Sequence, residues 1–180
     1  MKPPPATTFA ARIVLCAGLM LLAAAPAVRA ADKPATLDSA EQAFVAEATA
    51  DNSMQITLAQ VAQVRSQSSK VRALARRIID DHQALNRKFT DFSVARKAHG
   101  RAHGIPSRDV TEDKLRLENL QGDALDKAFA GMMVQEHQKV IPLYERAAKD
   151  EGNPRLQKIA REALPLLREH LQGARALSGG

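Results

Sequence analysis

The sequence predicts an all-α protein. Apolar residues recur at intervals of three and four along four long stretches, which is the spacing of amphipathic helices. No stretch alternates between apolar and polar residues as a half-buried strand does. Short turns join the first two stretches and the last two, whereas a long crossover joins the second to the third. This connectivity predicts a ferritin-like antiparallel four-helix bundle.

The first 30 residues have the pattern of a secretory signal peptide. A basic start with Lys2 and Arg12 precedes an apolar run, residues 13–25, and small residues flank Arg29 as a signal peptidase requires. We expect cleavage after Ala30 and export to the periplasm. The run is too short to remain as a spanning helix, so no permanent transmembrane helix is expected after cleavage. Cys16 lies early in the run, which disfavours lipid attachment.

The predicted mature chain has a nearly balanced charge and no cysteine. The signal peptide holds three of the 26 basic residues and none of the 20 acidic ones. The high isoelectric point is therefore no argument for nucleic acid, and a chain without Trp and with one Tyr has few rings to stack on bases. We expect no nucleic-acid partner. A chain of about 150 residues is long enough for one domain with a hydrophobic core.

A polar segment, residues 31–37, precedes the bundle, which we assign to residues 38–177 with a tail at 178–180. Asp38 and Glu41 have the spacing of a capping box that begins the first helix. The second helix has the most regular apolar stripe, ending near residue 100: Val71, Leu74, Ile78, His82, Leu85, Phe89 and Phe92.

The connection over residues 100–121 is expected to contain a short helix at 111–120. A third helix should run from about Asp123 to about Asp150. Pro154 has the first position of a fourth helix, which ends near Leu177.

Three histidines lie on the apolar stripes of the second, third and fourth helices: His82, His137 and His170. At a helical rise of about 1.5 Å per residue, His82 lies roughly 22 Å from the first hairpin turn and Gln55, on the first helix, roughly 18 Å from it. His137 and His170 lie at similar distances from the second turn. The sequence therefore predicts four polar side chains near mid-bundle, where partners, water or an ion must satisfy them.

An acidic residue directly precedes each of these histidines: Asp81, Glu136 and Glu169. Each acid points about 100° around its helix from the histidine. It is therefore expected either to reach a histidine of a neighbouring helix, as a hydrogen-bond partner behind a metal ligand, or to face solvent. Residues 79–85 and 134–140 also form a weak internal repeat around two of these pairs.

Three imidazoles and one amide are an acceptable ligand set for a single transition-metal ion such as zinc, copper or iron. A coupled di-iron centre is disfavoured because it needs Glu three residues before His. Those positions hold Ile79, Val134 and Leu167. Two other interpretations stay open: a histidine layer that fixes helix register and binds nothing, and an organic ligand.

Two further histidines, His99 and His103, lie in a basic loop and are expected to be solvated. The sequence contains no nucleophile elbow, glycine-rich phosphate loop or zinc cysteine cluster. No catalytic residue is therefore assigned.

The chain resembles a bacterial family known as domain of unknown function 4142, over residues 40–177. The resemblance rests on the order and spacing of Phe44-Val45, residues 79–82, Gly122 with residues 125–129, residues 134–137, and Leu164-Pro165 followed by His170. Members are exported ferritin-like bundles, and many are labelled outer-membrane or periplasmic proteins. The resemblance implies fold and export, but no established activity. The family usually has Glu where this chain has Gln55, so the resemblance puts iron in doubt here.

The leading hypothesis is thus an exported periplasmic ferritin-like bundle protein of unestablished activity. Its His82, His137 and His170, with Gln55, form a polar layer that is a candidate for metal binding or for a structural role. One alternative is an envelope stress or interaction module with a purely structural histidine layer. The other is a metal-dependent redox enzyme.

Overall fold

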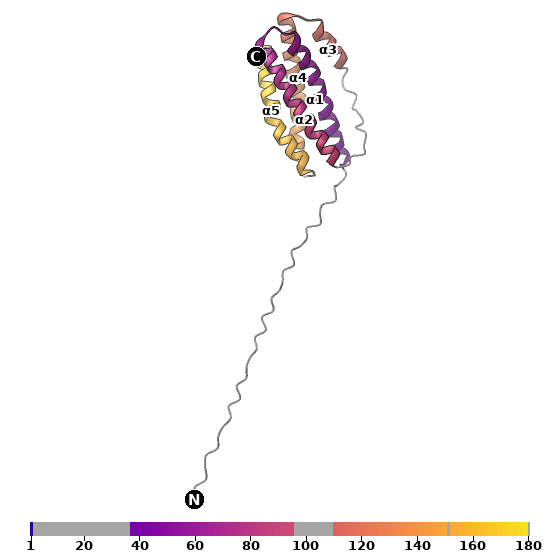
Figure 1. Cartoon of the computed structure of the whole chain (residues 1–180), viewed down its shortest axis with the longest axis vertical. Coiled ribbons are helices and arrows are strands. Elements are labelled where there is room, and N and C mark those ends of the chain that lie inside the picture. The colour runs from indigo at the N-terminus through magenta and orange to yellow at the C-terminus, as the bar shows by residue number, and fades with distance from the viewer. Residues whose placement is uncertain (2–36, 96–109, 151, 180) are drawn as a thin grey trace. The chain divides into compact units, whose positions relative to one another are not determined.

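Long α-helices make up most of the residues that the structure describes, and no strand occurs among them. This computed structural model describes Met1 and residues 37–95, 110–150 and 152–179. The helices are α1 (Ser39–Arg65), α2 (Ser69–Ala95), α3 (Val110–Glu118), α4 (Gly122–Ala147) and α5 (Pro154–Ser178) (Figure 1). The prediction of an all-α protein is confirmed.

Several predictions fall on residues outside this description. The predicted signal peptide after Met1, the polar segment up to residue 36, and both loop histidines, His99 and His103, are among them. Of the helices described, none is both long and apolar enough to cross a lipid bilayer.

Local hydrogen bonds set where α1 and α5 begin. The capping box predicted before α1 is present: the Glu41 backbone N–H donates to Asp38 Oδ1 at 2.8 Å, and the Asp38 N–H donates to Glu41 Oε2 at 3.0 Å. Asn153 caps α5, because its Oδ1 accepts from the backbone N–H groups of Arg155 and Leu156. Pro154 occupies the first turn of α5, as the sequence indicated.

The described helix ends lie within a few residues of the predicted ones, and turn hydrogen bonds explain the earlier end of the third long helix. The predicted end of the second helix, near residue 100, falls outside the described residues. We expected the third long helix to continue to about Asp150, but α4 ends at Ala147. The backbone N–H groups of Lys149 and Asp150 both donate to the Arg146 carbonyl, so the chain tightens into a turn there. The short helix predicted at 111–120 is α3, one residue earlier at its start and two at its end.

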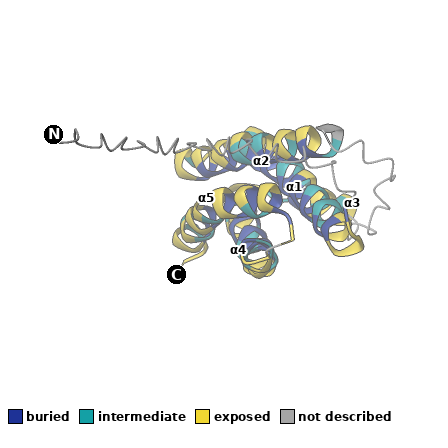
Figure 2. Cartoon of the chain, turned by 90° about the horizontal axis from the view of Figure 1, so that it is seen from below, coloured by how far each residue is buried: buried dark blue, intermediate teal, exposed yellow. Residues whose placement is uncertain are grey.

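The long helices pack as two hairpins laid against each other. The pair α1 and α2 forms one hairpin and the pair α4 and α5 the other, and further contacts run between α1 and α4 and between α2 and α5. The short α3 lies beside α1. Buried residues face the space between the helices and exposed ones face outward (Figure 2). Ser66 Oγ also donates to Asp126 Oδ1 at 2.6 Å, which ties the turn of the first hairpin to α4.

A polar layer divides the buried interior into two apolar clusters. Along α2, the cluster nearer the α1–α2 turn ends at Ile79 and the other begins at Leu85, with His82 between them. The same division falls at His137 on α4 and at His170 on α5. The position of the candidate site is therefore also the position where the apolar core is interrupted.

Removing the α5 cap should destabilise the second hairpin. Asn153→Ala deletes the oxygen that accepts from Arg155 and Leu156, and loss of such a cap costs about 1 kcal/mol. Asn153→Asp keeps an acceptor at the same place and should remain within about 0.5 kcal/mol of the wild type. Urea unfolding followed by circular dichroism measures both variants. Equal stability of the Ala and Asp variants would contradict this assignment of the cap.

Candidate metal centre

Three imidazoles from three helices meet in the interior. His82 on α2, His137 on α4 and His170 on α5 are each 0% exposed. Their ring centroids lie 5.2–5.7 Å from one another. One ring nitrogen of each lies within 4.8 Å of one ring nitrogen of each of the others. The heights estimated from helical rise therefore hold for all three histidines.

The first imidazole is oriented by an amide from the opposite helix of its hairpin. His82 Nδ1 lies 2.7 Å from Asn52 Oδ1, and Asn52 Nδ2 donates to Asn86 Oδ1 at 2.9 Å. Since an amide oxygen only accepts, His82 carries its proton on Nδ1 and leaves a lone pair on Nε2. That Nε2 is buried and has no hydrogen-bond partner.

The second imidazole is oriented by its own helix. His137 Nδ1 lies 2.8 Å from the Met133 carbonyl oxygen, one turn earlier on α4. The carbonyl must accept, so the proton is on Nδ1 and His137 Nε2 has a lone pair.

The third imidazole is oriented by a carboxylate. His170 Nε2 lies 2.9 Å from Asp81 Oδ2 on α2, which places the proton on Nε2 and the lone pair on Nδ1. His170 Nδ1 lies 3.2 Å from His137 Nε2. Two nitrogens that both have lone pairs thus face each other, and this contact is stabilised only by a proton or a metal ion between them.

Gln55 on α1 adds a fourth buried polar side chain. It is 0% exposed, and neither its amide oxygen nor its amide nitrogen has a hydrogen-bond partner. A buried amide without partners costs about 1–3 kcal/mol. The Gln55 amide therefore has unused hydrogen-bonding capacity in the buried interior.

Burial keeps the imidazoles neutral. Desolvation, and then the charge of the other histidines, hold the pKa of His82 well below its ordinary value of 6.5. The same two causes, with His170 as the charge, lower the pKa of His137 to about 4. Burial also lowers the pKa of His170, although Asp81 opposes the shift. At neutral pH a proton between His137 and His170 is therefore disfavoured, and neutral imidazoles are the form that binds metal.

The distances suit a small ion. Zinc binds imidazole nitrogen at about 2.0–2.1 Å, which places two nitrogens of a tetrahedral set about 3.3 Å apart. The His137–His170 nitrogen pair is already at 3.2 Å. His82 also has one ring nitrogen within 4.8 Å of a ring nitrogen of each of the other two histidines.

A family described as a domain of unknown function, DUF4142, matches residues 25–177. The chain belongs to the DUF4142 family. The match spans α1 to the last turn of α5 and confirms the resemblance inferred from the sequence motifs. Neither a search of curated proteins nor a search of solved structures gives a match. The DUF4142 description carries no activity, so function has to be argued from the site.

The acids that precede the histidines have unequal roles in this DUF4142 protein. Asp81 contacts a histidine of another helix, His170. Glu136 is buried, at 5% exposure. Glu169 instead lies at the surface and pairs with Arg77 of α2, which is the solvent-facing alternative of the two predicted for these acids. Its position about 100° around α5 from His170 turns it to solvent.

Sequence reasoning missed Asn52, the partner of His82. The signal was available, because Asn52 lies one turn before Gln55 on an otherwise apolar face that includes Ala48 and Ala59. The role of the Met133 carbonyl had no sequence signal, since any residue at that position supplies the same oxygen.

Stability of the metal-free protein should fall as the pH drops from about 6.5 towards about 4. In that pH window His137 is protonated in the unfolded state but stays neutral in the folded state. Lowering the pH therefore favours the unfolded state. The loss from His137 alone is on the order of 3 kcal/mol. Urea unfolding with a chelator present, at about pH 7 and about pH 5, measures this slope. His137→Gln should reduce the slope, and an unchanged slope would show that His137 is not held neutral by burial.

Proposed function

We propose that this DUF4142 protein is an exported ferritin-like four-helix bundle that binds one transition-metal ion. The ligands are His82, His137 and His170, with the Gln55 amide oxygen as the fourth donor. Export is supported by the signal-peptide pattern of residues 1–30, and its destination is the periplasm, with outer-membrane association as a further option. The ferritin-like topology is supported by two packed hairpins joined through a long connection.

The observation that carries the metal assignment is the set of hydrogen bonds on the outer side of each ring. Asn52, the Met133 carbonyl and Asp81 each take up one imidazole N–H. Three nitrogen lone pairs are then left inside a buried layer. A proton placed between His137 and His170 leaves His82 Nε2 unsatisfied. A metal ion accepts all three lone pairs at once.

The outer hydrogen bonds are those that metal sites require. A ligating histidine nearly always donates its other N–H to a carboxylate, a carbonyl or a similar acceptor, which fixes its tautomer and raises its basicity. All three acceptors here are of that kind. Imidazole donors suit zinc, copper and nickel, and the lack of a carboxylate among the four donors disfavours iron.

A structural histidine layer is the second candidate. The 3.2 Å contact between His137 and His170 favours it, because a shared proton there would make a hydrogen bond that links α4 to α5. The layer would then set helix register without a ligand. The redox-enzyme hypothesis is weaker, because the three rings and Gln55 are fully buried and a substrate would have to reach the ion.

Metal titration separates these two candidates. Tag-free wild-type protein should bind one equivalent of zinc or copper in calorimetry, since three preoriented imidazoles are present. The double variant His82→Ala with His137→Ala should lose at least about 100-fold in affinity. Replacing His99 and His103 by Ala removes as many histidines and should leave binding unchanged. Undetectable binding by the wild type would leave the structural layer as the function of the histidines.

Placing a carboxylate at the position of the fourth donor, Gln55, should make the stability of the protein depend on bound metal. Gln55→Glu buries a carboxylate, so the metal-free protein should lose a few kcal/mol of stability at neutral pH. Added Fe(II) or Zn(II) should restore that loss and bind more tightly than in the wild type, because the new ligand is anionic. Gln55→Leu is the matched control, in which stability rises and metal affinity falls. Thermal unfolding with and without metal measures both variants.

A further inference from the structure

The four donors of the proposed centre are all electrically neutral. The nearest carboxylate in contact with a ligand is Asp81, which accepts from His170 Nε2 at 2.9 Å and so lies behind the ring. The same Asp81 oxygen lies 3.7 Å from Arg77 Nε, and Arg77 also pairs with Glu169. Asp81 therefore places a negative charge beside the centre, and that charge is partly offset from its outer side.

Other buried acids near this level have partners of their own. Asp51, adjacent to Asn52 on α1, forms an ion pair with Lys139 of α4 at 3.2 Å. Glu136 is buried on α4 and also has an interaction partner. Neither residue belongs to the three-nitrogen set.

The charge of the ion decides the cost of placing it here. The free energy of moving an ion from water into an apolar interior grows with the square of its charge and is large even for a single charge. A monovalent ion would be balanced by Asp81. Asp81 alone would leave one charge of a divalent ion uncompensated beside fully buried groups, unless that ion brought an anion with it.

We infer that this centre selects a monovalent, imidazole-binding cation, Cu(I), over divalent ions. The inference rests on the proposed metal site and adds its ion class. Three imidazoles and no charged donor suit Cu(I), which accepts nitrogen ligands in a three-coordinate arrangement. Ligand distances of about 2 Å correspond to nitrogens about 3.5 Å apart in such an arrangement, so the 3.2 Å pair fits Cu(I) and zinc alike and the charge separates them. Ag(I) is the redox-stable probe of the same charge.

The test compares Ag(I) with Zn(II) on the full chain carrying Cys16→Ser, which removes its single thiol. In chloride-free buffer, Ag(I) should bind one equivalent at least about 100-fold more tightly than Zn(II). Long-range nitrogen NMR of this protein should show shifts at His82 Nε2, His137 Nε2 and His170 Nδ1. Competition with a Cu(I) chelator should give the same order of affinity for Cu(I). The NMR readout needs no histidine variant and so does not depend on how such a variant folds.

The outcomes distinguish this inference from the proposed function. Zinc binding as tight as silver binding, at the same three nitrogens, would overturn the ion class and leave the metal site in place. Absence of binding for both ions would overturn both. Silver binding without shifts at His82, His137 and His170 would place the ion outside the three-histidine set and overturn the inference.

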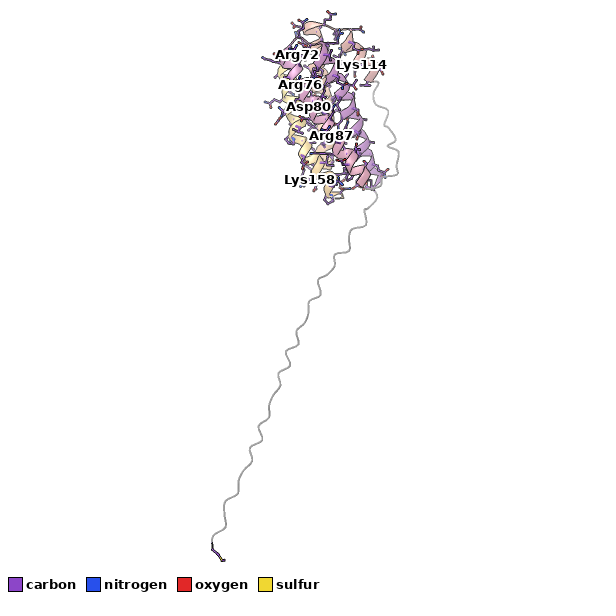
Figure 3. All side chains as sticks on the ribbon, viewed as in Figure 1. Arg72, Arg76, Asp80, Arg87, Lys114 and Lys158 are labelled. Carbon is purple, nitrogen blue, oxygen red and sulfur yellow. The ribbon has the colours of Figure 1, made fainter. Side chains whose placement is uncertain are left out.

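A matched pair of charge variants tests the role of Asp81. Asp81→Asn removes the compensating charge and should weaken Ag(I) binding about tenfold. Asp80→Asn removes one charge from the neighbouring position, an exposed residue between Arg76 and Arg87 along α2 (Figure 3), and should leave affinity unchanged. Equal effects of the two substitutions would show that Asp81 acts only through the net charge of the surface and would overturn its assigned role.

Discussion

The structure depends on the need to satisfy imidazole nitrogens inside an apolar core. Each buried nitrogen without a partner costs about 1–3 kcal/mol, a sizeable share of the stability of a small domain. Three of the six nitrogens find acceptors in Asn52, the Met133 carbonyl and Asp81. The other three have lone pairs in the same buried layer, which a proton, a buried water molecule or a metal ion can satisfy.

The same contacts connect the helices into one unit. Asn52 and His82 link α1 to α2, and Asp81 and His170 link α2 to α5. The ring of His170 also lies against that of His137 on α4. Apolar clusters above and below supply the burial, but apolar contacts alone tolerate sliding of one helix along another. Directional contacts at a single level fix the register of the helices, and the register in turn holds the three nitrogens together. The contacts that stabilise the helix packing are therefore the same contacts that position the candidate site.

The internal repeat of residues 79–85 and 134–140 does not predict which contacts its residues make. Asp81 and Glu136 occupy equivalent positions beside His82 and His137, yet Asp81 serves the histidine of α5. Glu169, the acid that precedes the α5 histidine, forms an ion pair with Arg77 that joins α5 to α2 at the surface. A centre with one carboxylate behind one ring follows from this asymmetry. Because the DUF4142 description names no activity, such details of the site, and not the fold, must indicate function.

The sequence by itself determined the helical class, the helix ends within a few residues, the family and the depth of His82, His137 and His170, because these follow from local periodicity, capping and helical rise. Only the tertiary structure decided which acceptor faces each ring. Asn52 and Asp81 differ little in sequence from other polar residues near a helix interface, and Glu169 has the same local pattern as Asp81. Whether such a residue reaches a histidine or solvent depends on helix rotation and on the partner across the interface, which no single stretch of sequence specifies.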